Sequence, residues 1–179
     1  PKNIENLQYL TFAAAISVAL SIKKTTKLQT KIKWPNDVHY KGKKLCGILT
    51  EAVFGKESYV IVGIGLNANQ QDFPIEIKNT ATSLKIITKK EINIGKIKKI
   101  IINEFYRLYS QYYNKNKSSE ISRIWKKHCD TLGKEVAIIK KNKTITGKAI
   151  GIDKNCNLIL LQRNKKIIKI MEGDIRVRY

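Results

Sequence analysis

Two long apolar segments, separated by a very short connection, constrain the fold of this chain more than any other feature. They are residues 45–54 and 58–67, and Gly55 and Lys56 lie between them. Each segment is nearly continuous in apolar residues, a pattern typical of strands that are buried on both faces. We therefore expect two neighbouring strands in the centre of a folded domain.

The second strand carries glycines where its side chains should alternate. Side chains of a strand point to opposite faces in turn, so Gly63 and Gly65 leave one face bare while the even positions supply a core face. Gly47 adds a bare position on the neighbouring strand, and Asn67 marks the end of the bare face. A bulge or tight packing would explain this pattern by itself, and so would a ligand that approaches the backbone closely.

The rest of the chain predicts an α+β unit followed by a small all-β unit. Helical spacing of apolar residues favours helices over residues 5–24, 92–113 and 121–128, and residues 31–34 read as a short strand. After Gly133 come five short strand-like segments with turn residues between them, which indicates a small antiparallel barrel or sandwich. The predicted domains are residues 1–130 and 131–179. The predicted strands of the second unit are residues 135–140, 144–152, 158–162, 166–171 and 175–179.

Composition limits the classes of function. The net charge is +21, but only five of the 35 basic residues are Arg, the favoured reader of bases and phosphates, so nucleic acid is not the expected partner. Cys46, Cys129 and Cys156 stand far apart, as do His39 and His128, so no metal site or disulfide framework is predicted. The longest apolar run is too short to span a bilayer, which favours no membrane and a reduced, cytoplasmic compartment.

A predicted hairpin before the apolar strands gathers chemically active side chains. Pro35 restricts the backbone of Trp34 and so fixes the position of its indole ring. Asn36 and Asp37 shape the first turn. A tight hairpin over residues 40–43 then returns the chain and should bring Lys44 back beside Asp37. An exposed ion pair would be the simple account of that contact. With the bare strand, these residues also describe a pocket for a planar, anionic ligand.

The same residues closely resemble the biotin–protein ligase family. The resemblance is carried by KWPNDV at residues 33–38, KKLCGILTE at 43–51, VGIGLNAN at 62–69 and ATSL at 81–84, in the family's order and at its approximate spacing. It implies a partial class II synthetase-like catalytic domain, with a mixed sheet packed by helices, and then a small Src-homology-3-like β-barrel. The family makes biotinyl-5′-AMP from biotin and ATP and transfers the biotin to a lysine of a carboxyl-carrier domain.

The resemblance also implies a role for each site residue. Lys44 would contact the biotin carboxyl and the α-phosphate, and Asp37 would orient the carrier lysine and help to remove its proton. The remaining implied residues divide between a biotin-binding floor, which is Gly47, Gly63 and Gly65, and a nucleotide side, which is Trp34, Asn36 and Asn67. Mg²⁺ is implied with the triphosphate, without assigned ligands.

One departure from the family concerns the loop that covers the ligands. The family's arginine- and glycine-rich loop precedes the helix that begins this chain, and the first glycine here is Gly42. We therefore expect residues 1–179 alone to make little adenylate. The implied partner is the carrier domain of acetyl-CoA carboxylase or a related carboxylase, and the resemblance leaves a homodimer open. Alternatives are a lipoate–protein ligase, a basic nucleic-acid-binding module and an inactive fragment.

Overall fold

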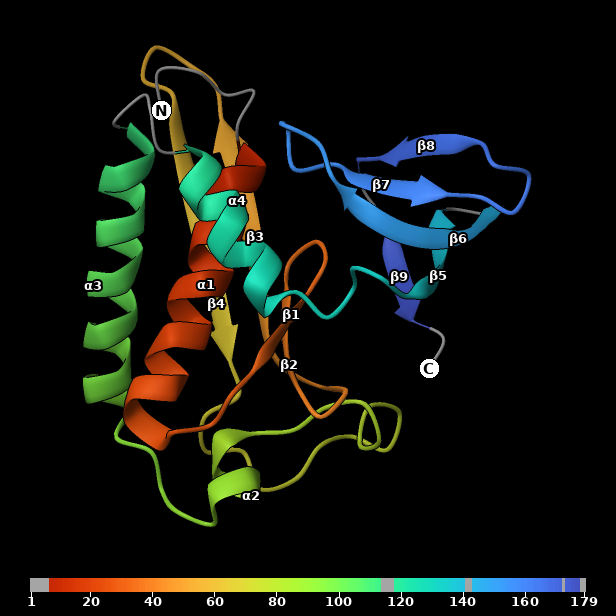
Figure 1. Ribbon diagram of the computed structural model, residues 1–179. Coiled ribbons are helices and arrows are strands. Elements are labelled where there is room, and N and C mark those ends of the chain that lie inside the picture. Colours follow the sequence, from red (N-terminus) through yellow and green to blue (C-terminus); the bar gives the residue numbers. More distant parts are fainter. Residues whose placement is uncertain (1–6, 114–117, 141–142, 172, 178–179) are drawn as a thin grey trace.

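The computed structural model describes residues 7–113, 118–140, 143–171 and 173–177 (Figure 1). The described chain forms two antiparallel sheets, and helices pack against the first of them. The helices are α1 (Leu7–Thr26), α2 (Leu84–Thr88), α3 (Ile94–Tyr113) and α4 (Ser118–His128). The strands are β1 (Lys31–Lys33), β2 (Asp37–Tyr40), β3 (Lys43–Val53), β4 (Tyr59–Leu66), β5 (Glu135–Lys140), β6 (Lys143–Ile152), β7 (Leu158–Leu161), β8 (Ile167–Ile170) and β9 (Asp174–Val177).

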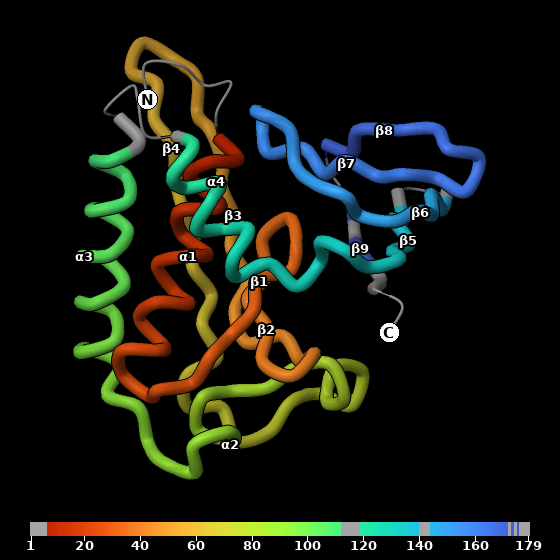
Figure 2. Tube along the Cα trace, viewed as in Figure 1, coloured from red at the N-terminus to blue at the C-terminus, as the bar shows by residue number. Residues whose placement is uncertain are grey.

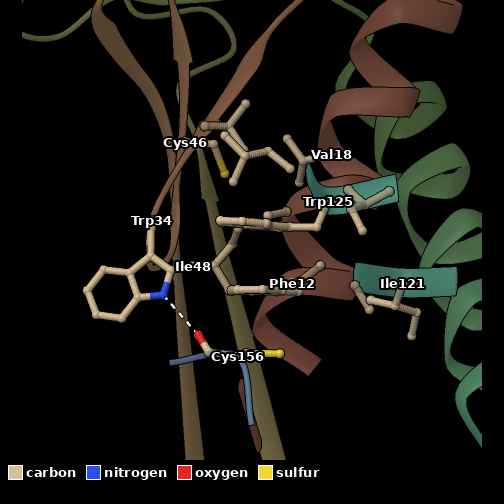
Figure 3. Packing of buried hydrophobic residues seen from close by; sticks show 14 of the residues in the cluster. Phe12, Val18, Trp34, Cys46, Ile48, Ile121, Trp125 and Cys156 are labelled. Carbon is tan, nitrogen blue, oxygen red and sulfur yellow. Dashed lines mark hydrogen bonds between the residues drawn. The ribbon is translucent and has the colours of Figure 1, made fainter. Parts of the chain in front are cut away.

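Helix α1 is the centre of the first unit, where the sequence predicts a helix over residues 5–24. It is apolar almost all round, and a helix of that kind is normally buried on most of its surface. It contacts β3 on one side and α3 and α4 on others. Phe12 stacks on Trp125 of α4 with the ring centroids 4.3 Å apart, and Figure 3 shows this pair within the core.

The first sheet has the order β1-β2-β3-β4, with every neighbouring pair antiparallel. Its inner face, which includes Ile48 and Ile64, packs in the core cluster with α1. The outer face is exposed: Leu49, Tyr59 and Ile61 expose 60%, 52% and 50% of their surface. The expectation that both faces of these strands are buried is therefore wrong in the described structure. An apolar run shows that a strand can be buried, but it does not show whether another layer of structure packs on each face.

The second sheet, with the order β8-β7-β6-β5-β9, contains all five segments predicted as strands. Residues 178 and 179, at the end of the last predicted strand, lie outside the described residues. Buried side chains of Ile138, Leu158 and Leu160 form the core of this sheet. Cys156 lies in a turn before β7 with a φ of 64°, which explains why glycine is favoured at such a position.

Hydrogen bonds join the second sheet, its turns and the segment before it to the first unit. The indole nitrogen of Trp34 donates to the carbonyl of Cys156 at 3.1 Å, and the hydroxyl of Tyr9 donates to the carbonyl of Lys154 at 2.6 Å. The backbone of Asp130 donates to the carbonyl of Ile32 at 2.8 Å. The trace in Figure 2 places the segment after α4 between the two sheets, so the second sheet lies beside β1 and β2.

None of the helices in the described ranges combines the length and the apolar content that crossing a membrane requires.

Candidate functional site

A β-bulge brings Lys44 to the same face of the sheet as Gly47. Along the β2–β3 pair, Val38 faces Cys46 and the next residue, His39, faces Lys44, so β3 advances two residues for one on β2. In a regular strand, residues 44 and 47 would point to opposite faces. With the bulge, the ammonium Nζ of Lys44 would lie 3.2 Å from a Cβ added at Gly47.

On this face Lys44 meets Asp37. The Nζ of Lys44 lies 2.7 Å from Oδ1 of Asp37, and the backbone of Asp37 is directly opposite Gly47. The hairpin between the two strands turns through Lys41 and Gly42, which both have positive φ values, of 47° and 80°. This is the backbone that a tight two-residue hairpin requires. The predicted approach of Lys44 to Asp37 is confirmed.

The backbone of Lys44 is held from a second side by the segment that contains ATSL. Its amide donates to the carbonyl of Thr80 at 2.7 Å, and its carbonyl accepts from the amide of Thr82 at 2.9 Å. ATSL was one of the motifs that carry the resemblance, and no role was predicted for it from the sequence. The structure identifies residues 80–82 as the support that fixes the position of Lys44.

Three glycines form a flat floor beside Lys44, as the alternation predicted. Gly47 pairs with Gly65 and Leu49 pairs with Gly63 across β3 and β4, on the exposed face of the sheet. A Cβ added at Gly63 or Gly65 would meet only atoms of β3, at 3.6 Å or farther. The space above the glycines is therefore open to whatever approaches the backbone.

The two predicted asparagines make local hydrogen bonds. The amide nitrogen of Asn36 donates to the carbonyl of Ile48 at 2.8 Å, and that of Asn67 donates to the carbonyl of Thr82 at 3.1 Å. Both side chains therefore help to hold the strands and loops around the glycine floor. Their contacts with a nucleotide remain predictions.

Trp34 has a different place from the one predicted. Its side chain is only 1% exposed, and its indole nitrogen is engaged by Cys156 of the second unit (Figure 3). In the described structure the ring packs between the two units, which gives no support to the interpretation that it lines the nucleotide side. The proline that follows does restrict the ring, but sequence alone could not tell which surface the ring meets.

Burial and pairing set the charges of the site. Burial would raise the pKa of Asp37, but the interactions of its carboxylate with His39 and Lys44 outweigh it and hold the pKa below its usual value. Burial raises the pKa of the neighbouring Cys46 thiol to about 12, and the charge of Asp37 adds to this effect. Asp37 is therefore an anion at neutral pH, and Cys46 is a protonated thiol without nucleophilic character.

His39 was missed by the sequence analysis, which treated it as isolated. Its side chain is buried, with Nδ1 at 3.1 Å from the carbonyl of Gly42 and Nε2 at 3.6 Å from Oδ2 of Asp37. Its position two residues after Asp37 on the same strand was the available signal, because such residues share a face. Among the described residues, no group of three or more His, Cys, Asp or Glu side chains is placed to hold a metal ion.

Comparison with known protein families gives two matches. The model described as "Biotin/lipoate A/B protein ligase family" matches residues 1–69, which include the hairpin and the glycine floor. The model described as "Biotin protein ligase C terminal domain" matches residues 131–178, which include the second sheet.

Individual relatives agree with these matches. The chain is 36% identical over 178 residues to the "Bifunctional ligase/repressor BirA" of Bacillus subtilis, which covers 97% of the chain and 54% of that protein. It is 28% identical over 171 residues to the "Biotin--[acetyl-CoA-carboxylase] ligase" of Mycobacterium tuberculosis, covering 93% of the chain and 61% of the relative. The chain therefore spans between half and two thirds of the length of these curated relatives.

A solved structure matches nearly the whole chain. The biotin protein ligase from Aquifex aeolicus in complex with biotin and ATP superposes with a TM-score of 0.85 at 30% sequence identity. The match covers 99% of this chain and 74% of that one, and the apo structure of the Aquifex ligase gives a TM-score of 0.86 with 78% of that chain covered.

Proposed function

This chain belongs to the biotin protein ligase family, and from that premise we propose that the protein activates biotin with ATP and transfers it to a lysine of a carrier protein. One observation carries the proposal. Lys44, Asp37 and the glycines meet on one open face of the sheet, with 2.7 Å between Lys44 and Asp37. The relative from Aquifex aeolicus that the chain matches over 99% of its length is a complex with biotin and ATP.

In the first step, the biotin carboxylate attacks the α-phosphorus of ATP, which forms biotinyl-5′-AMP and releases pyrophosphate. Negative charge builds up on the oxygens around that phosphorus as the new bond forms. The ammonium of Lys44 lies over the glycine floor and stabilises this charge, which a fixed cation does without reorganisation. Gly47, Gly63 and Gly65 let the ligand lie directly on the backbone, because no Cβ stands in the way.

In the second step, the amine of the carrier lysine attacks the biotinyl carbonyl, and AMP leaves. Asp37 is the only carboxylate beside Lys44 in the described site, and its lowered pKa keeps it ionised. An ionised carboxylate attracts and orients the incoming ammonium and takes a proton from it, which leaves the neutral amine to attack. The nitrogen loses its second proton to the departing AMP or to water as the amide bond forms. Lys44 and the carrier lysine therefore use the same carboxylate in turn.

Asn36 and Asn67 are proposed for the nucleotide side, at the margin of the glycine floor. Mg²⁺ would accompany the triphosphate, since this ion usually binds through substrate phosphates and water with few protein ligands. The described residues present no cluster of metal-ligating side chains, so no step is assigned to the metal.

The carrier proposed is the biotin carboxyl-carrier domain of acetyl-CoA carboxylase or a related carboxylase. It is supported by the Mycobacterium tuberculosis relative, which is named for acetyl-CoA carboxylase. Cytoplasmic action is a further part of the proposal, which leaves a homodimer open. Free thiols at Cys46, Cys129 and Cys156 are compatible with a reducing compartment.

Formation of the adenylate from biotin and radiolabelled ATP by the complete protein tests the proposal. Lys44→Ala should lower the rate by about 100-fold or more, the size typical of losing an electrostatic contact to the transition state. Lys43→Ala is the matched control, because Lys43 is an exposed lysine on the adjoining position, and its rate should stay within about twofold. Equal rates for the two variants would remove Lys44 from the mechanism.

The same assay decides between neighbouring activities. Lipoate in place of biotin should give no adenylate, and the opposite preference would make the protein a lipoate ligase. A salt-sensitive shift of nucleic acid that Lys44→Ala leaves unchanged would favour the nucleic-acid-binding alternative. We propose further that residues 1–179 alone form little adenylate, because the space above Gly63 and Gly65 is open to water.

A further inference from the structure

We propose that a cationic hollow between α1, β1 and α4 binds a phosphate group, either as inorganic phosphate or as the end of a small phosphate monoester. Its basic lining comes from Lys23 of α1, Lys31 of β1, and Lys127 and His128 of α4, and the buried Thr30 lines it as well. The hollow contains none of the residues assigned to biotin or ATP. The inference therefore goes beyond the proposed function and does not depend on it.

Backbone contacts hold the elements around the hollow together. The end of α4 lies against β1, where Ile32 and Cys129 form a parallel bridge (Figure 1). The amide of Asp130 donates to the carbonyl of Ile32 at 2.8 Å, and α1 contacts both β1 and α4. The basic side chains therefore start from a fixed framework and not from one loop.

Positive charge collects in this hollow without a carboxylate to balance it. No Asp or Glu is among the residues that line the hollow, and within the described part of the chain Lys23, Lys31 and Lys127 form no ion pair. Asp130, which follows α4, pairs with Lys134 at 2.8 Å. Like charges gathered in this way repel one another, and an anion placed among them removes that repulsion.

The imidazole of His128 shows that all three lysines act on the same space. Its pKa is lowered first by burial and then by the charges of Lys31, Lys23 and Lys127. These lysines come from a strand and from two helices, so the positive field reaches the ring from each element that surrounds the hollow.

A simpler account explains only part of this cluster. Lys23 and Lys127 lie in the last turns of α1 and α4, where a cation interacts favourably with the helix dipole. Lys31 is on a strand and has no such role. The helix dipoles also give no reason for an unpaired hydroxyl in the same place.

That hydroxyl belongs to Thr30 and is an independent sign of a missing partner. Thr30 is only 4% exposed, and its Oγ1 has no hydrogen-bond partner within the described residues. Buried hydroxyl groups normally have one, because leaving a donor unpaired is unfavourable. An oxygen of a phosphate group in the hollow can accept a hydrogen bond from Thr30 while the lysines balance its charge.

The size of the hollow limits what it can hold. Its volume is about 120 Å³, whereas pockets for drug-sized ligands measure about 300–1,000 Å³. One phosphate group suits this space, and a whole nucleotide does not. A phosphate monoester carries a charge of about −1.5 to −2 at pH 7, which suits a site with three lysines.

Calorimetric titration of the complete protein with inorganic phosphate tests the proposal, at a constant ionic strength of about 0.15 M set with chloride. We expect saturable binding at one site. Thr30→Val removes the donor but no charge, and should weaken binding by about fivefold. Lys31→Ala combined with Lys127→Ala should weaken it by about tenfold or more. The matched control, Lys99→Ala with Lys126→Ala, removes the same charge from exposed positions outside the hollow and should change the affinity by less than about twofold.

The imidazole resonances of His128 give a second, local measurement. Bound phosphate counteracts the charges of the three lysines, so the pKa of His128 should be higher in phosphate than in chloride at equal ionic strength. The signal that is lost in His128→Gln identifies the residue. Repeating the titration with glycerol phosphate distinguishes the two sources of the group: tighter binding than inorganic phosphate assigns the hollow to a monoester, and weaker binding assigns it to free phosphate.

Two results would overturn the inference. Equal losses of affinity in the two double-lysine variants, with no effect of Thr30→Val, would mean that phosphate is attracted by the general charge of the surface. Binding that Lys44→Ala abolishes and Thr30→Val leaves unchanged would place the phosphate at the proposed catalytic site. Neither result involves biotin transfer, so both would leave the proposed function as it stands.

Discussion

Nζ of Lys44 lies 2.7 Å from Oδ1 of Asp37, and this contact depends on a bulge that turns Lys44 toward the face of Gly47. Without the extra residue of β3, the lysine would point to the opposite face of the sheet. The reactive cation and the carboxylate are therefore brought together by a local irregularity of pairing, supported from outside by the backbone of residues 80–82.

Replacing Asp37 should separate the two steps of the reaction. In Asp37→Ala, Lys44 keeps its charge and its backbone support, so adenylate formation should fall by less than about tenfold. Transfer to the carrier should fall by about 100-fold, because the ammonium of the carrier lysine loses its orienting acceptor. Single-turnover assays measure the two rates separately, and Asp72→Ala, at an exposed carboxylate in the 70–82 loop, is the control. A larger loss in adenylate formation than in transfer would contradict this role.

Filling the glycine floor should reduce binding while leaving the fold intact. A Cβ at Gly65 would lie 3.7 Å from the carbonyl oxygen of Gly47, which is an ordinary contact, so Gly65→Ala is sterically tolerated. The new methyl group stands where the ligand would rest, and we expect the KM for biotin or ATP to rise by about tenfold or more. Gly55→Ala, in the β3–β4 connection, is the matched control for the substitution itself. Unchanged KM values with an unchanged melting temperature would show that nothing rests on this floor.

The part of the site that sequence could predict is the part that short-range rules determine. Alternation along residues 60–67 located the bare face, and the turn at Lys41 and Gly42 followed from hairpin chemistry. The contact of His39 with Asp37 and the burial of Trp34 depend on pairing register and on packing between units. The spacing of Asp37 and His39 on one strand indicated a shared face but not their contact. No local spacing indicated the burial of Trp34 or the exposed outer face of β3 and β4.

Trp34 should contribute to stability and not to nucleotide binding. Trp34→Phe keeps most of the buried ring but removes the hydrogen bond to the carbonyl of Cys156, at a cost of about 1 kcal/mol in the free energy of unfolding. Trp34→Ala should cost about 3–5 kcal/mol, since it empties a fully buried site. Urea unfolding measures both effects. The Kd of the complete protein for ATP should stay within about twofold in Trp34→Phe, and a large loss of affinity with normal stability would restore the nucleotide role.

Glu104 should make the stability of the first unit depend on pH. It lies on α3, where one carboxylate oxygen pairs with Lys24 of α1 and the other accepts from Arg107 at 3.0 Å. Burial would raise its pKa, but hydrogen bonds from Lys24 and Arg107 lower it below the ordinary value of 4.5. A group whose pKa is lowered by folding stabilises the folded state above its unfolded pKa, and this stabilisation disappears as the pH falls through the folded pKa.

Glu104→Gln should therefore lower the free energy of unfolding by about 1 kcal/mol at neutral pH, a modest amount because Lys24 is largely exposed. The difference from the wild type should be constant above about pH 5 and should shrink progressively at lower pH. Urea unfolding at a series of pH values measures it, with Glu57→Gln at the exposed β3–β4 connection as the control. A difference that stayed constant or grew as the pH fell would contradict the pairing of Glu104 with both cations, because only the wild type has a carboxylate here to lose by protonation.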